Sequence, residues 1–75
     1  MRASEIRELP DREILKAIEE AKRELFKLRF QREVGQLEDS SRMRKVKRDI
    51  ARLKTILRER QLAKELVKKE NRNAQ

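Results

Sequence analysis

The sequence has no cysteine, histidine, tyrosine or tryptophan, and its 75 residues include one glycine, one proline and two phenylalanines. Without cysteine or histidine, a disulfide and a structural zinc site are both excluded, although these commonly stabilise chains of this size. With 36% hydrophobic residues, the chain is too short to enclose a substrate-sized cavity and still build a core. Its stability must therefore come from regular helix packing or from a permanent partner.

Side chains that could carry out catalysis are also scarce. An enzyme needs a nucleophile with a base, paired buried carboxylates or a metal. The serines Ser4, Ser40 and Ser41 stand where helices are expected to begin, so helix capping explains them. A lone Gly35 cannot form a phosphate-cradling loop. We therefore expect no enzymatic activity, no small-molecule substrate, no cofactor and no metal.

Long apolar runs are missing as well. No stretch approaches the roughly 20 apolar residues of a membrane-spanning helix. The first residues lack the apolar core of a signal peptide, and acidic residues come too early for a transit peptide. These features predict a soluble, intracellular protein without a membrane span.

Charged residues, in contrast, make up 48% of the chain, which carries a net charge of +8. The excess lies in one half. Residues 1–39 hold nine basic and ten acidic side chains, whereas residues 40–75 hold thirteen basic and four acidic ones. This asymmetry is typical of a protein that turns one face toward a polyanion such as a phosphate backbone.

The residue types predict an all-α fold. Glu, Lys, Arg, Leu and Ala dominate, and no strand-like alternation occurs. Pro10 marks a helix start and Gly35 a left-handed helix end. We expect one domain, 1–75, containing an antiparallel, coiled-coil-like hairpin of two long helices with a short N-terminal helix. The expected ranges are 3–9 for the short helix, 10–34 and 40–66 for the long helices, 35–39 for the turn and 67–75 for a frayed tail.

Apolar residues recur in steps of three and four along both long helices, which indicates a narrow seam on each. The first seam consists of Ile14, Ile18, Ala21, Leu25 and Leu28, and the second of Met43, Val46, Ile50, Leu53 and Leu57. A short turn makes the helices antiparallel neighbours, so the seams face each other. So small a core gives marginal stability, which favours a place inside a larger assembly.

Basic residues cover the side of the second long helix that faces away from its seam. Nine basic and two acidic residues lie between Arg42 and Arg60. At about 100° per residue, the far face carries Arg44, Lys45, Arg48 and Arg52. Arg58 lies between the far face and the seam, and Lys47 and Lys54 flank the seam. A solvated face is the alternative, but it usually interleaves Glu with Lys, as the first helix does. We favour a polyanion, and among polyanions structured RNA over DNA or a membrane surface, since the chain lacks a DNA-reading zipper and a broad apolar face.

Four segments resemble a known family. They are RASEIREL at 2–9, ELFKLRFQ at 24–31, GQLE at 35–38 and RMRKVKRDIARLKTILRER at 42–60. Together they resemble the family of bacterial large-subunit ribosomal protein twenty-nine over about residues 1–62. The sequence departs from this family at Pro10, where a serine cap is common, and in a longer tail whose Leu62, Leu66 and Val67 fall off the seam.

The resemblance implies a structural constituent of the large ribosomal subunit that binds 23S-type rRNA near the nascent-chain exit, beside ribosomal protein twenty-three. It places the protein in cytoplasmic ribosomes, with organellar ribosomes as the other option. The candidate RNA-binding residues are Arg29, Gln31, Arg42, Arg44, Lys45, Lys47, Arg48, Arg52, Lys54 and Arg58. For Phe26 and Phe30, packing against Val46 or Met43 is the favoured interpretation, and base stacking is the other.

Two further functions stay open on the residues alone. One is a protein-interaction coiled coil that dimerises through its seams or docks an acidic partner. The other is a nonspecific DNA-binding protein that neutralises phosphates without reading sequence.

Overall fold

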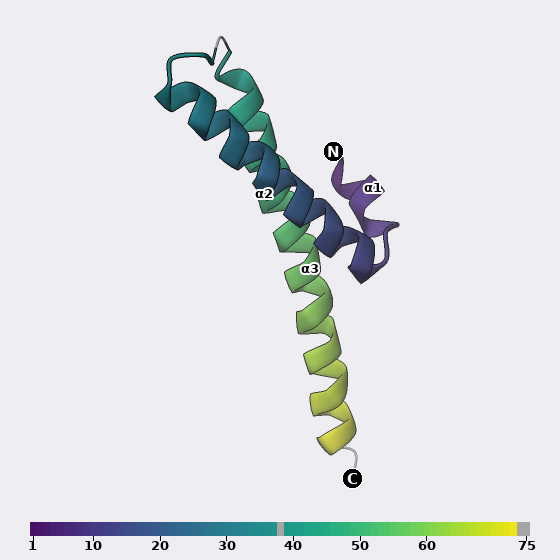
Figure 1. The fold of residues 1–75 in the computed structure, drawn as a ribbon. Helices are drawn as coiled ribbons and strands as arrows, with labels where there is room; N and C mark the ends of the chain where they lie inside the picture. Colours follow the sequence, from purple (N-terminus) through teal and green to yellow (C-terminus); the bar gives the residue numbers. More distant parts are fainter. Residues whose placement is uncertain (38, 74–75) are drawn as a thin grey trace.

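The protein folds into two long antiparallel helices with a short helix beside them (Figure 1). The structure, a computed structural model, describes residues 1–37 and 39–73. Helix α1 spans Ala3–Arg7, α2 spans Asp11–Glu33 and α3 spans Ser41–Asn73. α2 and α3 pack along each other, and α1 packs against α3. The molecule is elongated, with principal dimensions of 61 × 21 × 17 Å, and the all-α hairpin predicted from the sequence is confirmed.

Glycine ends α2. Gly35 has a φ of 73°, the left-handed conformation in which a side chain is unfavourable. Its N–H donates to the carbonyl of Arg32 at 3.1 Å, and the N–H of Gln36 donates to the carbonyl of Gln31 at 2.7 Å. This pair of bonds is a Schellman motif, which satisfies carbonyls at the end of the helix. The left-handed cap expected at Gly35 is confirmed.

The turn places an acidic cap before α3. One carboxylate oxygen of Asp39 accepts from the backbone N–H of Ser41 at 2.9 Å, and the other accepts from the Ser41 hydroxyl at 2.7 Å. These bonds hold the pKa of Asp39 below its ordinary value, the hydroxyl bond being the larger cause. Because Asp39 is a carboxylate beside the positive end of α3, it also stabilises the start of this helix.

Helix α3 is longer than the sequence predicts. We expected a helix to 66 and a frayed tail over 67–75, but α3 continues to Asn73, and residues 74–75 lie outside the described residues. The stretch after Arg60 contains good helix formers without glycine or proline, and Glu65 precedes Lys69 by four residues. A helix already nucleated by packing therefore extends through it. Residues 61–71 are all exposed, since α2 begins opposite Arg60 and covers none of them.

The two predicted seams form the core between α2 and α3. All ten seam residues are buried or half-buried; the buried ones are Ile14, Ile18, Leu28, Met43, Ile50 and Leu53. The sequence reading missed Ile56, which is 4% exposed although it lies outside the seam. Ile6 of α1 is 1% exposed and belongs to the same cluster, so α1 widens the buried face of α3 beyond what one partner helix would cover.

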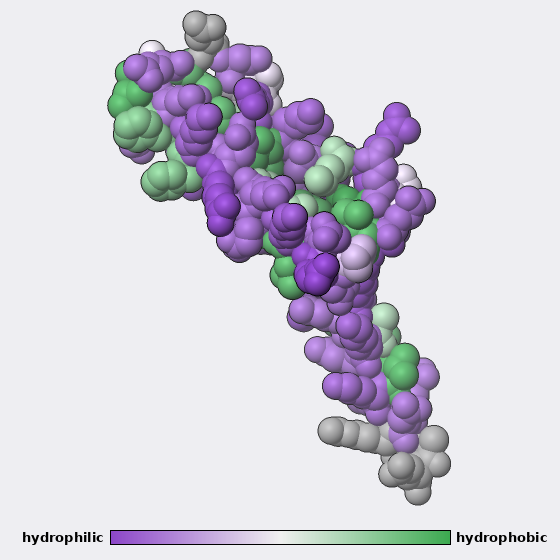
Figure 2. All heavy atoms as spheres, turned by 45° about the vertical axis from the view of Figure 1, so that its right-hand side comes forward, coloured by the Kyte–Doolittle hydropathy of each residue, from purple (hydrophilic) through white to green (hydrophobic). Residues whose placement is uncertain are grey.

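Two phenylalanines lie outside the core. Phe26 is 77% exposed and Phe30 is 58% exposed, so the favoured prediction that they pack against Val46 or Met43 is wrong. At about 100° per residue, both lie on the side of α2 opposite its seam, and Val34, just after the helix, is exposed as well. Figure 2 shows hydrophobic surface near the end of the molecule where α2 ends. Phe26 and Phe30 are exposed because the seam is narrow. The seam side chains alone fill the space between α2 and α3, so large residues outside the seam remain in contact with solvent.

Candidate nucleic-acid interface

The outer face of α3 is a continuous basic surface. Its members, all exposed, are Arg44, Lys45, Lys47, Arg48, Arg52, Lys54 and Arg58. At about 100° per residue they cover roughly half of the helix circumference. We call these seven residues the α3 basic face. The α2 seam occupies the opposite side of α3, so packing with α2 leaves the basic face uncovered.

The charges of this face are largely unbalanced. Within residues 1–37 and 39–73, none of its seven members forms an ion pair with a carboxylate. Arg52 donates to the backbone carbonyl of Met1 at 2.6 Å, which uses one of its five donors and leaves its charge in place. Like charges held this closely repel one another, and phosphates lying along the helix would relieve the repulsion.

The start of α3 adds a second electrostatic feature. Its first turn, from Ser41 to Arg44, contains no acidic residue. Basic side chains at a helix N-terminus are unfavourable, because they meet the positive end of the helix dipole and its free N–H groups. The Asp39 carboxylate, which precedes this turn and accepts from the Ser41 N–H, offsets part of that cost.

The remaining candidates lie at the turn. Gln31 and Arg42 line one hollow there, together with the carboxylate of Asp39. Arg42 forms an ion pair with Glu24 of α2 at 3.0 Å, so its charge is offset in a way that the α3 basic face is not. Arg29 is exposed on α2. The structure thus brings Gln31 and Arg42 together and places them at one end of the basic face.

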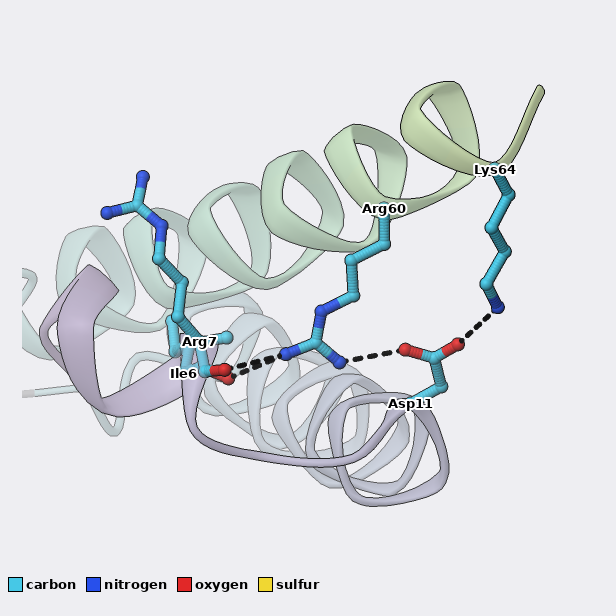
Figure 3. Close-up of polar contacts among 5 residues, drawn as sticks. All are labelled: Ile6, Arg7, Asp11, Arg60 and Lys64. Carbon is cyan, nitrogen blue, oxygen red and sulfur yellow. Dashed lines mark hydrogen bonds and ion pairs between the residues drawn. The ribbon is translucent and has the colours of Figure 1, made fainter. Parts of the chain in front are cut away.

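Arg60 has a structural role that the sequence reading did not assign. Its guanidinium donates to the Asp11 carboxylate at 2.8 Å and to the backbone carbonyls of Arg7 at 3.0 Å and Ile6 at 3.4 Å (Figure 3). Lys64 donates to the other Asp11 oxygen at 3.3 Å. One arginine therefore joins the end of α1, the start of α2 and the side of α3. The sequence does contain a signal for this role, because Arg60 is positioned beside the apolar seam of α3 and not on the far face of the helix.

The same contacts determine the ionisation of Asp11. The hydrogen bond from Arg60, and then that from Lys64, hold the pKa of Asp11 below its ordinary value. A carboxyl group with a lowered pKa in the folded state stabilises the fold while it is ionised. The contact is therefore present at neutral pH and is lost in acid.

Other chemistry finds no support in the described part of the chain. There, no group of three or more His, Cys, Asp or Glu side chains could hold a metal ion, and no polar or charged residue is buried. Among the described residues, no helix is apolar enough over a sufficient length to cross a membrane.

Similarity to known proteins now identifies the family. The family model described as Ribosomal L29 protein matches residues 4–60. A protein of Carboxydothermus hydrogenoformans is 54% identical over 69 residues, covering 92% of this chain and 100% of the relative. One from Geobacillus stearothermophilus is 59% identical over 63 residues, covering 84% and 96%, and one from Streptomyces griseus is 54% identical over 66 residues, covering 88% and 89%. All three are named large ribosomal subunit protein uL29.

These matches cover most of the chain, including the basic block of α3, and they confirm the resemblance drawn from the four sequence segments. The match to the family model ends at Arg60, so the rest of α3 lies outside that match. The chain belongs to the ribosomal L29 protein family, whose members are structural, non-enzymatic constituents of the large ribosomal subunit.

Proposed function

We propose that this protein binds large-subunit, 23S-type rRNA through the α3 basic face, near the nascent-chain exit of the large subunit. The observation that carries this proposal is the α3 basic face itself: seven exposed cations on one side of one helix, without an ion pair among the described residues. Arg29, Gln31 and Arg42 extend the RNA-binding surface toward the turn.

The mode of recognition follows from the side chains present. Arginine binds phosphate through two parallel N–H donors, and four of the seven residues are arginines. The small residues Ala51 and Thr55 lie among them and let an RNA backbone approach the helix closely. A rigid helix of this kind reads the shape and phosphate positions of folded RNA rather than base sequence. The protein thereby neutralises and supports neighbouring rRNA segments.

The outer face of α2 suits a protein partner. Phe26 and Phe30 are exposed there, Val34 is exposed just after the helix, and aromatic side chains are enriched at protein interfaces. We propose ribosomal protein twenty-three as the neighbour on this side, in cytoplasmic ribosomes. This partner is suggested by the family resemblance, and the exposed phenyl rings of Phe26 and Phe30 indicate the surface that would contact it.

Salt dependence of rRNA binding tests the main proposal. The purified protein is titrated with in vitro-transcribed 23S rRNA at increasing KCl concentrations. If five to seven phosphates are engaged, the log–log slope of affinity against salt is roughly −4 to −6. Cosedimentation with large subunits and crosslink mapping then locate the site. An affinity that does not change with salt would contradict the proposal.

One form of the rival function is a coiled coil that dimerises through its seams, and for this form the hairpin leaves no seam free. The seam residues are buried or half-buried within one chain. Light scattering in RNA-free buffer is therefore expected to give a monomer, whereas a stable dimer would favour the rival.

A further inference from the structure

A hollow of about 220 Å³ lies where α1 crosses α3. Ala3 of α1 and Ala51 and Ile56 of α3 give it an apolar lining. The hollow opens beside the α3 basic face, since Arg48 and Arg52 belong to both. None of the ten candidate residues named from the sequence lies on α1, so this helix adds a surface that the basic face alone does not contain.

Three arginines surround the hollow: Arg7 from α1, and Arg48 and Arg52 from α3. Glu59 is its one acidic residue, and it lies 3.9 Å from Arg7, which offsets its charge. The hollow therefore keeps a net charge of +2. Arg7 and Glu59 are more than half exposed, so their pairing is weak and Arg7 is free to turn to a phosphate.

The hollow is built before any ligand arrives, because α1 is held on α3 at both ends. At its start, Arg52 donates to the Met1 carbonyl at 2.6 Å, and the Met1 amine contacts Asp49 at 3.2 Å. At its end, Arg60 donates to the Arg7 carbonyl at 3.0 Å. Because the site is preformed, less conformational entropy is lost when a ligand binds.

Size and lining identify the kind of ligand. Sites for whole small molecules have about 300–1,000 Å³, so a hollow of 220 Å³ admits only a part of a ligand. A flat ring fits an apolar lining, and a phosphate fits a rim of arginines, which also stack on bases. An unpaired nucleotide of folded RNA offers both parts on one short unit.

We propose that the hollow between α1 and α3 binds one unpaired nucleotide of large-subunit rRNA. The base lies against Ala3 and Ala51, and its phosphate contacts Arg7 together with Arg48 or Arg52. This inference rests on the proposed function and adds to it: α1 is part of the RNA-binding surface, and the site selects RNA with an unstacked base at that point.

Filling the hollow tests the proposal without a change in charge. Ala51→Leu places a larger side chain in it, and Ala63→Leu makes the same change at an exposed alanine of α3 beyond the hollow. Binding of in vitro-transcribed 23S rRNA is measured for both, with helix content checked by circular dichroism. We expect Ala51→Leu to weaken binding about tenfold and to remove one base crosslink, whereas Ala63→Leu binds like the parent.

A second pair of variants tests the phosphate contact. Arg7→Ala removes the arginine that α1 contributes, and Arg12→Ala removes an exposed arginine of α2. Losing one phosphate contact changes the salt slope by about 0.7–0.9, which we expect for Arg7→Ala only.

The outcomes separate the two proposals. If the parent protein binds 23S rRNA with the expected salt slope while Ala51→Leu and Arg7→Ala bind equally well, this inference is overturned and the proposed function stands. Equal binding by the variants is also the result expected if the hollow is occupied by a side chain of another protein or by water alone. If the parent protein itself shows no salt-dependent binding, the proposed function fails first.

Discussion

Helices α2 and α3 both carry an apolar seam, but they differ in their first turns and in their outer faces. Each has one apolar seam, and the seams meet in the core. The first turn of α2 carries Asp11 and Glu13, which suit a helix N-terminus, whereas the first turn of α3 carries no acid. The outer face of α2 mixes charges with exposed phenyl rings, while that of α3 is basic. Folding thus determines one side of each helix and leaves the other side for binding.

The largest expected loss of stability comes from a substitution in the apolar interface between α2 and α3. Leu53→Asp puts a carboxylate at a position that is 0% exposed, and it also deletes core volume. We expect a loss of about 4 kcal/mol or more, which unfolds a hairpin of this size. Circular dichroism at 222 nm and urea titration measure the loss.

The matched control is Leu62→Asp, on the same helix at a leucine that is 43% exposed. It is expected to change the free energy of unfolding by less than about 0.5 kcal/mol. Equal losses in the two variants would contradict the division of α3 into a packing side and a binding side.

Reversing charge on one outer face and then the other sharpens the contrast. The triple variant Arg44→Glu, Arg48→Glu and Arg58→Glu removes three proposed phosphate contacts. We expect 23S rRNA affinity to fall at least about 100-fold, near 2.8 kcal/mol, with helix content unchanged.

The corresponding variant of α2 is Arg12→Glu, Lys16→Glu and Arg23→Glu. It changes the net charge by the same amount as the α3 variant. If its 23S rRNA affinity falls only slightly, binding depends on the α3 basic face and not on total charge. If both triple variants lose affinity alike, a nonspecific electrostatic interaction explains the binding.

Removing Arg60 separates structural from RNA-binding arginines. Arg60→Ala deletes the donors to the carbonyls of Ile6 and Arg7, which we expect to cost about 1–2 kcal/mol and to free α1. Hydrogen exchange of the α1 amides reports the release. Arg58→Ala, two residues away on the basic face, is expected to leave exchange unchanged and to weaken RNA binding instead.

Acid is expected to weaken the contact between α2 and α3 at Asp11. Since Arg60 and Lys64 hold the pKa of Asp11 below its ordinary value, its stabilising effect is complete above that ordinary value. It disappears as the pH falls through the lower pKa of the folded state. Urea midpoints of the parent and Asp11→Asn should therefore differ at pH 7 and converge in strong acid. A difference that persists there would assign the effect to something other than ionisation.

The smallest expected effect concerns the exposed rings of α2. Phe26→Ser removes a side chain that is 77% exposed, so the free energy of unfolding should change by less than about 0.5 kcal/mol. In a pull-down with ribosomal protein twenty-three, the same variant is expected to bind less, with rRNA affinity preserved. Strong destabilisation would mean that the ring packs in the fold after all.

Much of this fold could be read from local signals. The three- and four-residue spacing predicted the seams, and Gly35 predicted the helix end, because both depend on residues close in sequence. The placement of α1 could not be predicted, since its few apolar residues, including Ile6, fit several surfaces. The burial of Ile56 and the role of Arg60 follow from that placement. The basic face could be predicted residue by residue, but its hollow could not, because α1 forms one of its walls.

The contacts of α1 have a consequence for how a newly made chain reaches this fold. Its hydrogen-bonding partners Asp49, Arg52 and Arg60 follow 48 to 54 positions later in the sequence, so these bonds cannot form until that part of α3 has been made. At a translation rate of about 5–20 residues per second, the first helix waits roughly 2–10 s for the surface it needs. During synthesis, then, α1 is made before α3 but gains its hydrogen bonds only after α3 has been made.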